Sequence, residues 1–417
     1  MSASPLITLK ANWVLPVQGP PIAGGLVTLG PERVFEVSQA NSTAAADLDL
    51  GNCLLLPRLV NAHTHLEFSG LAEPFPATGG FPAWVREVIK WRQARELAAA
   101  EPGRMQAEAI AAGMLECRAR GTGLVGEIAS MPWPDGGYAV PPRAIVFLEQ
   151  LGVLPGQAAE RLASVKNRIS AFKGGGPEVG LSPHAPYSLS RQLFDGLKQL
   201  ARDQGLPVAM HVAETREEID WLKGADNGFT QLQERLGVPA RQQWRPDLRQ
   251  LLAELAELER VLVIHGNYLG PRDWEVLAEH RQRMSLIYCP RTHQHFGHPR
   301  YPLPELLSAG VRVAAGTDSR ASTPDLDLLA ELRLIRKLYP ELPPEQVLDL
   351  GTRAAAEALG EADRWGVISA GASPELLVVP LPEFDVAGPV AWLLDSAVSP
   401  QLLDWSSARA AAQAVRQ

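Results

Sequence analysis

Eight apolar runs of strand length, separated by helix-like stretches, constrain the fold of this chain more than any other feature. Each run is nearly continuous in apolar residues, as strands buried on both faces of a parallel sheet are. The runs lie at residues 59–63, 124–128, 144–149, 179–182, 207–211, 261–265, 285–289 and 311–315. Between them, apolar residues at three- and four-residue steps predict helices at 83–100, 104–120, 189–204, 248–258 and 325–338. The sequence therefore predicts an α/β fold, a (β/α)8 TIM-type barrel over residues 57–360.

An open, doubly wound sheet is the competing arrangement of alternating strands and helices. It requires a glycine-rich phosphate-binding turn after its first strand. The first run here ends instead in His63-Thr64-His65, and the glycine-rich Gly174–Gly176 precedes a strand rather than a helix. The barrel is therefore the better interpretation.

Short strand-like segments occupy both ends of the chain, broken by Gly, Pro and Asn-Ser. They lie at residues 7–9, 13–15, 25–29, 34–37, 48–50, 54–56, 376–379 and 390–394. An alanine-rich segment, Ser406–Val415, favours a helix. Because chain termini often lie close together, we expect residues 1–56 and 361–417 to form one discontinuous, β-sandwich-like small domain.

Composition excludes several classes of partner. The net charge of −8 argues against a nucleic-acid surface. Three widely spaced cysteines, Cys53, Cys117 and Cys289, favour a reducing compartment without disulfides or a cysteine zinc site. We see neither a signal peptide nor an apolar run of membrane-spanning length, which predicts a cytoplasmic protein that acts on a small molecule.

Five of the nine histidines lie at or just beyond the ends of predicted strands. They are His63, His65, His184, His211 and His265, and Asp318 follows the last strand. A single histidine at a strand end is more often a hydrogen-bonded core residue than a ligand, whereas the whole set together with Asp318 favours a metal site. The carboxyl ends of barrel strands meet at one face, where such enzymes carry their active sites.

His63 and His65 point the same way because residues two apart on a strand share a side. With His211 and Asp318 they supply three imidazoles and one carboxylate, a set suited to a single Zn²⁺ or Fe²⁺ with room for water. Such an ion lowers the pKa of a bound water toward ~7. Asp318 can help to deprotonate that water. His265 orients the water or the oxyanion, or alternatively serves as a fifth ligand.

Glu214 lies three residues after His211, within reach of a leaving group but outside the ligand set. A carboxyl group that carries a proton from the nucleophile to the leaving group is what hydrolytic deamination requires. The alternative for Glu214 is a solvated charge at a helix N-terminus. We expect that solvated role for Glu217 and Glu218 instead.

These motifs resemble the amidohydrolase superfamily, in particular its mononuclear cytosine deaminase/chlorohydrolase branch. The matching segments span the barrel in the family's order: Val60–His65, Ser182–Ser188, His211–Thr215, His265-Gly266 and Gly316–Ser319. The resemblance implies a barrel with a small β-domain, a Zn²⁺ or Fe²⁺ ion, deamination of purine-like, pyrimidine-like or triazine rings, and for some members homo-oligomers. Within the branch, residues 63–69 and 289–293 are most similar to aminofutalosine-deaminase-like members, which act on a 6-aminopurine nucleoside.

Several residues near the strand ends are candidates for substrate binding, and the resemblance itself indicates one of them. His184 matches a position that contacts a ribose hydroxyl in nucleoside deaminases. Further candidates are Glu67, Trp84, His293 and Arg320, with Glu127 and Glu149 recognising ring nitrogens or stabilising the barrel mouth. Phe81 and Trp84, in the loop after strand one, either stack on a flat ring or, for Trp84, pack a helix. Arg320 either meets an anionic group or forms an ion pair outside the pocket.

Two departures from family patterns bear on substrate and metal. Residues 66–76 lack the Arg-Gly pair of adenosine-derivative deaminases, which puts S-adenosylhomocysteine-type substrates in doubt. Strand four ends in Ser182-Pro183-His184 without the lysine that bridges two metals in binuclear relatives, so one metal is expected. The histidines of residues 291–298 are accordingly interpreted as loop or pocket-lining residues.

Other functions are weighed on the same residues. A non-catalytic metal-binding scaffold has no use for Glu214, and a phosphate-binding barrel needs a glycine-rich loop after strand seven or eight. A nucleic-acid deaminase carries a Pro-Cys-x-x-Cys motif that is absent here. Hydrolysis of a chlorinated s-triazine or an amide stays open, because the pocket rather than the ligand set selects the leaving group.

Overall fold

The protein is described by a computed structural model that covers residues 6–39, 46–99, 101, 103–130, 133, 142–172, 177–383, 386–403, 408 and 410. The chain divides into two compact units, residues 1–61, 116–124 and 327–417 in the first and residues 62–115 and 125–326 in the second. This grouping adds residues 57–61, 116–124 and 327–360 to the predicted terminal segments. The predicted domain limits at 56/57 and 360/361 stay a prediction.

The first unit contains a mixed seven-stranded sheet built from both ends of the chain, in the order β15-β14-β5-β1-β2-β3, with β4 beside β1. Its strands are β1 (Ile7–Val14), β2 (Ile22–Leu29), β3 (Val34–Gln39), β4 (Leu48–Asp49), β5 (Cys53–Pro57), β14 (Leu376–Pro380) and β15 (Gln401–Leu402). Ile7, Leu9 and Ala11 alternate inward along β1 and pack in the core of this sheet. The C-terminal β14 pairs antiparallel with β5, which confirms that both termini contribute to the small sheet.

Two predictions for the terminal segments are wrong. The two segments predicted at 7–9 and 13–15 form the single strand β1, which ends at Val14 and whose register with β2 continues across Ala11 and Trp13. The predicted strand at 390–394 is helix α14 (Pro389–Asp395). Pro389 fits the first helical turn, and the buried residues Val390, Leu393 and Leu394 follow the helical spacing of three and four.

The remaining helices of the first unit are α11 (Leu328–Leu338), α12 (Pro344–Leu350) and α13 (Arg353–Leu359). Helix α11 begins at the cap of Asp327, whose side chain accepts from the N–H of Ala330. It packs against α12 and α14. The predicted helix at 406–415 lies outside the described residues, apart from 408 and 410, and so does the Gly174–Gly176 turn.

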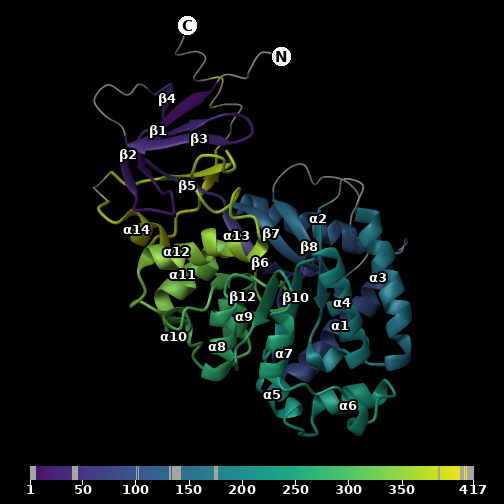
Figure 1. The fold of residues 1–417 in the computed structure, drawn as a ribbon. Coiled ribbons are helices and arrows are strands. Elements are labelled where there is room, and N and C mark those ends of the chain that lie inside the picture. The colour runs from purple at the N-terminus through teal and green to yellow at the C-terminus, as the bar shows by residue number, and fades with distance from the viewer. Residues whose placement is uncertain are drawn as a thin grey trace. The chain divides into compact units, whose positions relative to one another are not determined.

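All eight predicted barrel strands are present and form one sheet in sequential order from β6 to β13 (Figure 1). They are β6 (Leu59–Thr64), β7 (Thr122–Ala129), β8 (Arg143–Gln150), β9 (Glu178–Pro183), β10 (Val208–Val212), β11 (Val261–His265), β12 (Met284–Tyr288) and β13 (Val313–Ala315). A bridge between Thr64 and Asp318, where the N–H of Asp318 donates to His63 O at 3.0 Å, joins the two ends of the sheet. The prediction of a (β/α)8 barrel is confirmed.

Helices and short 3-10 turns connect the barrel strands. They are η1 (Leu66–Phe68), α1 (Phe81–Ala98), α2 (Arg104–Ala119), η2 (Pro155–Gln157), α3 (Ala158–Phe172), η3 (Pro186–Ser188), α4 (Arg191–Gln204), α5 (Arg216–Leu222), α6 (Gly228–Arg235), η4 (Ala240–Gln242), α7 (Leu248–Leu255), α8 (Pro271–Glu279), α9 (Pro290–His295) and α10 (Leu303–Ser308). Helix α4 shows why these segments fold as they do. Ser190 caps it, Leu193 and Leu197 lie on its buried face, and it ends at Gly205, whose φ of 62° suits glycine.

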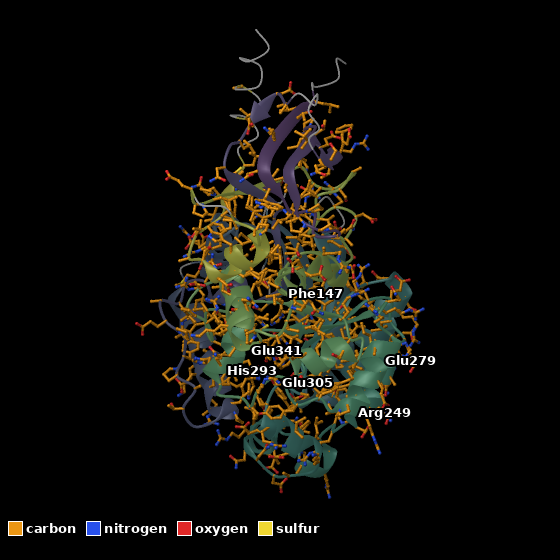
Figure 2. All side chains as sticks on the ribbon, turned by 90° about the vertical axis from the view of Figure 1, so that its left-hand side faces the viewer. Phe147, Arg249, Glu279, His293, Glu305 and Glu341 are labelled. Atoms are coloured by element: carbon orange, nitrogen blue, oxygen red, sulfur yellow. The ribbon has the colours of Figure 1, made fainter. Side chains whose placement is uncertain are left out.

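The outer helices of the second unit present charge to solvent while the strands are packed with apolar side chains. Figure 2 shows Arg249 and Glu279 at the outer edge of this layer and Phe147 in the interior. Among the described helices, none has the length and apolar composition that crossing a membrane requires. The cytoplasmic location stays a prediction.

Candidate functional site

The barrel strands bring five metal-donor side chains together at their carboxyl ends. His63 lies on β6 with His65 directly after it, His211 on β10, His265 on β11, and Asp318 follows β13. Among the described residues they form two overlapping groups, His63-His211-His265 and His63-His65-Asp318, each with donor atoms within 4.8 Å of one another. His63 is common to both groups, so the five donors surround one point.

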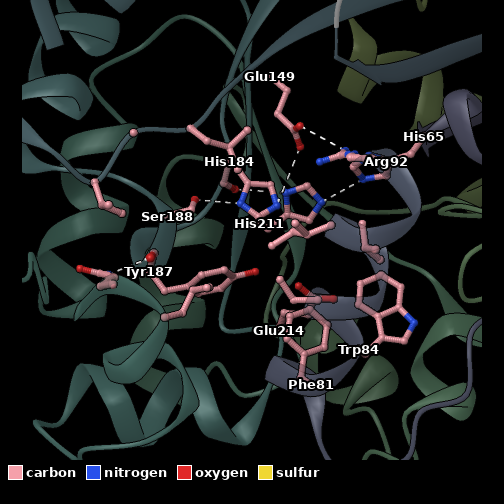
Figure 3. A pocket seen from close by; sticks show the side chains of 18 of the residues that line it. His65, Phe81, Trp84, Arg92, Glu149, His184, Tyr187, Ser188, His211 and Glu214 are labelled. Atoms are coloured by element: carbon pink, nitrogen blue, oxygen red, sulfur yellow. Dashed lines mark hydrogen bonds and ion pairs between the residues drawn. The ribbon is translucent and has the colours of Figure 1, made fainter. Parts of the chain in front are cut away.

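The orientation of His211 fits a metal ligand. Its Nδ1 lies 3.1 Å from the carbonyl oxygen of His184, so this nitrogen carries the proton and donates it there. The lone pair is then on Nε2, which faces Nε2 of His65 at 3.3 Å (Figure 3). Two buried imidazole nitrogens that face each other this closely are well suited to sharing a cation.

The charge states of the cluster also fit a divalent metal. Burial, reinforced by neighbouring imidazoles, holds the pKa values of His65 and His211 well below the ordinary value for histidine. Burial by itself raises the pKa of Asp318, but His63, whose Nε2 lies 3.7 Å from Asp318 Oδ1, and the other nearby imidazoles outweigh it and lower that pKa. Neutral imidazoles and an ionised carboxylate are the forms that coordinate metal.

The backbone is strained where the site residues project. Ala213, His265 and Asp318 have φ values of 54°, 67° and 60°, in the left-handed region that residues with a Cβ rarely adopt. Hydrogen bonds hold these conformations, including one from the buried Tyr301 hydroxyl to His265 O at 3.1 Å. Strain of this kind is characteristic of functional sites, where the surroundings fix an unfavourable geometry.

Glu214 lies beside the donor cluster without joining it. Its Oε1 is 3.5 Å from Nε2 of His265, and only 5% of the residue is exposed. Burial, with smaller contributions from Asp318 and Glu218, raises the pKa of Glu214 well above the ordinary value for glutamate. A carboxyl group that keeps its proton near neutral pH can donate it to a substrate atom.

The expectation that Glu218 is a solvated charge is wrong. The residue is fully buried, because the first turn of α5 folds back beneath the Glu214 turn. Its two oxygens accept from the N–H groups of Ala213 and Glu214 at 3.0 and 2.8 Å. Burial raises the pKa of Glu218 to about 7 despite these hydrogen bonds. Glu217 is half-buried, and its carboxylate accepts from the N–H of Phe81 at 3.3 Å.

A cavity of about 410 Å³ opens over the cluster in the second unit (Figure 3). Its polar base is formed by His65, His184, His211, Glu214, His265 and Asp318. Its walls are mainly apolar: Phe68, Phe81, Trp84, Val85, Val88, Ile89, Leu151, Val153, Leu154, Leu232 and Leu236. Apolar walls with a few convergent polar groups are typical of small-molecule sites.

The predicted substrate-binding residues are divided between the cavity and its surroundings. His184 and Trp84 line the cavity, whereas Glu67, His293 and Arg320 are absent from its lining. Phe81 and Trp84 belong to the first turn of α1 rather than to a loop, and their rings stack with centroids 5.4 Å apart.

The three residues outside the lining have contacts elsewhere. Arg320 donates from Nε to the carbonyl of Leu71 at 2.9 Å. His293 packs against the rings of His298 and Tyr301. Glu67 is engaged by arginines, as described next, so we do not propose these three as substrate contacts.

Sequence reasoning missed Arg92, which reaches the cavity from α1. Its guanidinium lies 2.7 Å from Glu67 Oε1 and 3.4 Å from Glu149 Oε2, and Glu149 in turn lies 3.9 Å from Nε2 of His184 (Figure 3). Arg95 adds a second ion pair to Glu67 at 2.6 Å. No local sequence pattern predicts a functional position for Arg92, because the residue lies in a helix away from the motifs.

The structure assigns different surroundings to the two glutamates whose roles the sequence left open. Glu149 lines the cavity beside Arg92. Glu127 lies outside the cavity lining, where it accepts from the Thr64 hydroxyl at 2.6 Å and from the Leu66 N–H at 3.0 Å. Glu127 therefore holds the turn that carries His65 at the barrel mouth.

Glu67→Gln should lower the free energy of unfolding by about 3 kcal/mol, because two largely buried guanidinium groups lose their shared carboxylate. Arg92, Arg95 and Ser130 outweigh burial and lower the pKa of Glu67 below its ordinary value of 4.5. The ion pairs therefore contribute fully above that value and lose their contribution as pH falls through the lower folded-state value.

Urea unfolding of wild type and Glu67→Gln between pH 7 and pH 3 measures this difference. The difference in free energy of unfolding between the two proteins should be constant above pH 5 and should decrease below about pH 4.5. If the difference in free energy of unfolding is the same at pH 3 as at pH 7, the ion pairs of Glu67 are not its cause. Glu108→Gln, at an exposed carboxylate of α2, is the matched control.

Comparisons with known proteins agree with the geometry of the site. A sequence model of the amidohydrolase family matches residues 54–397. The aminodeoxyfutalosine deaminase of Deinococcus radiodurans is 30% identical over 325 residues, 74% of this chain and 73% of that protein. The 5-methylthioadenosine/S-adenosylhomocysteine deaminase of Moorella thermoacetica is 28% identical over 398 residues, 89% of this chain and 85% of that protein.

A crystal structure shows that the fold is shared across this range of sequences. Helicobacter pylori aminofutalosine deaminase, solved in complex with methylthio-coformycin, superposes with a TM-score of 0.81 at 22% identity. The match covers 95% of this chain and 98% of that chain. At this identity the likeness extends to the fold alone.

Proposed function

The chain belongs to the amidohydrolase family, and we propose that it hydrolyses the bond between the ring carbon and the amino group of a 6-aminopurine nucleoside and so releases ammonia. The observation that carries the proposal is Glu214, a buried carboxyl group with a raised pKa that lies 3.5 Å from His265 at the edge of the donor cluster. A metal-binding scaffold has no use for such a group. The two named relatives are deaminases, which supports the same reaction.

Enzymes of this family use a divalent metal, and the described donors fit one. We propose a single Zn²⁺, or alternatively Fe²⁺, held by His63, His65, His211 and Asp318, with His265 as a fifth ligand or as an orienting group. When bound, the ion lowers the pKa of a coordinated water so that it ionises near neutral pH. The histidine and carboxylate donors favour a borderline ion of this kind over Mg²⁺ or Ca²⁺.

The side chains then divide the proton transfers of deamination. Asp318, whose pKa is lowered, accepts a proton from the attacking water. Burial lowers the pKa of His265 to about 3, so it is neutral and orients the water by a hydrogen bond. Glu214 donates its proton to a ring nitrogen, takes up the proton of the hydroxyl group added to the ring carbon and passes it to the departing amino group, so that ammonia leaves and the ring gains a carbonyl oxygen. The proton held by Asp318 then restores the proton on Glu214.

The cavity supports a nucleoside with an apolar 5′ substituent. His184 and Glu149 offer polar contacts suited to ribose hydroxyls, and Phe81 and Trp84 present aromatic surface to a flat ring. Most of the remaining lining is apolar and includes Leu151, Leu232 and Leu236, with Gln157, Arg161 and Gln233 as polar members. We therefore expect a 5′-thioether-substituted adenosine to be used better than adenosine, by about tenfold in kcat/KM.

Ammonia release from a substrate panel tests the proposal. The panel contains adenosine, 5′-methylthioadenosine, S-adenosylhomocysteine, aminodeoxyfutalosine, guanine, cytosine and aminotriazines, each with and without a chelator. We expect release from a 6-aminopurine nucleoside that the chelator abolishes. Turnover of triazines alone would favour the competing s-triazine or amide hydrolase, and no release by the metal-loaded protein would exclude a deaminase. Homo-oligomerisation and a cytoplasmic location stay proposals.

A further inference from the structure

We propose that Glu218 and Asn267 are positioning residues that together clamp the turn bearing Glu214 and so aim its carboxyl group at the substrate. The inference rests on the proposed deamination, in which Glu214 moves protons. Neither residue lines the cavity. Both therefore act through Glu214 and not on the substrate itself.

Glu218 holds the N–H side of the turn. Its carboxyl oxygens accept from Ala213 N at 3.0 Å and from Glu214 N at 2.8 Å, and the N–H of Thr215 adds a further hydrogen bond. A helix-capping glutamate ordinarily satisfies only the N–H of the capping residue, which here is Thr215. The two additional hydrogen bonds come from the N–H of Ala213, which has the left-handed φ, and from the N–H of Glu214.

Asn267 and its neighbour hold the carbonyl side. Nδ2 of Asn267 donates to Glu214 O at 2.9 Å, and the N–H of Tyr268 donates to Ala213 O at 3.1 Å. Both donors lie in the segment that follows β11, which ends at His265. The turn is therefore tied to the segment that presents His265, the imidazole that faces Glu214.

These contacts account for a strained turn at this position. Alanine rarely adopts the left-handed φ of 54° seen at Ala213, so the surroundings must hold it there. Every backbone N–H and carbonyl of Ala213 and Glu214 has a named hydrogen-bond partner. Releasing one side lets the turn relax and moves the Glu214 carboxyl group away from His265.

Glu218→Gln tests the clamp with little change of volume. The amide offers one acceptor oxygen in place of the two that accept from Ala213 N and Glu214 N. We expect kcat to fall about 10- to 100-fold while KM stays within about twofold and bound zinc is unchanged. Asn267→Ala should shift kcat in the same direction. Asp220→Asn, at an exposed carboxylate on the same helix, should retain wild-type kcat.

Hydrogen exchange at residues 212–215, measured on the same zinc-loaded proteins, provides a readout independent of turnover. Exchange should accelerate in Glu218→Gln and stay at the wild-type rate in Asp220→Asn. The clamp would be overturned if Glu218→Gln showed the wild-type exchange rate or the wild-type kcat. It would also be overturned if kcat fell only in proportion to a loss of bound zinc. A wild-type protein that releases no ammonia refutes the deamination instead, and the exchange rates still decide whether Glu218 holds the turn.

Discussion

Glu214→Gln is expected to lower kcat by about 10²- to 10⁴-fold while bound metal stays at the wild-type level. Glutamine keeps the shape of the side chain but cannot donate or carry the proton that the buried, raised-pKa carboxyl holds beside His265. The residue lies outside both donor groups, so the metal should not depend on it.

Steady-state ammonia release and elemental analysis of the purified variant test this prediction together. Glu279→Gln makes the same chemical change at an exposed carboxylate of α8 and should behave as wild type. Loss of metal from Glu214→Gln would mean that Glu214 is a ligand rather than a proton carrier. Retention of full activity would remove the observation on which the proposed function rests.

Removing the metal is expected to abolish ammonia release and to lower the melting temperature. His63 belongs to both donor groups and is fully buried, so an empty site leaves several imidazoles and Asp318 facing one another without a cation. An ion that binds only the folded state stabilises it by mass action, and its removal reverses that stabilisation. Zn²⁺ added back to the dialysed protein should restore both properties.

The experiment compares chelator-treated and reconstituted protein by calorimetry and turnover, with Zn²⁺ and Fe²⁺ added separately. His65→Ala should bind metal weakly, whereas His280→Ala, which removes a histidine at the end of α8, should bind it normally. Full activity after removal of all metal would contradict the proposed mechanism. A metal content of two per chain would contradict the single site.

Much of the fold can be predicted from the sequence, because strands and helices differ in the spacing of their apolar residues. All eight barrel strands coincide with apolar runs, and buried strands of a parallel sheet need apolar residues on both faces. The segment at 390–394 is a helix and not the predicted strand, because a run of five apolar residues does not distinguish a strand from a helix. The helix start at Pro389 and the packing of its buried side decide in favour of the helix.

The meeting of His63, His65, His211, His265 and Asp318 can be predicted from the sequence, because every parallel barrel strand points its carboxyl end to the same face. Which charges are buried and which are paired depends on the tertiary contacts. Glu218 follows Glu217 in a helix start that looks solvated, yet it folds beneath a strained turn. Arg92 meets Glu67 and Glu149 from a separate helix. The burial and pairing of charges depend on contacts between segments far apart in the sequence, and local apolar spacing does not predict such contacts.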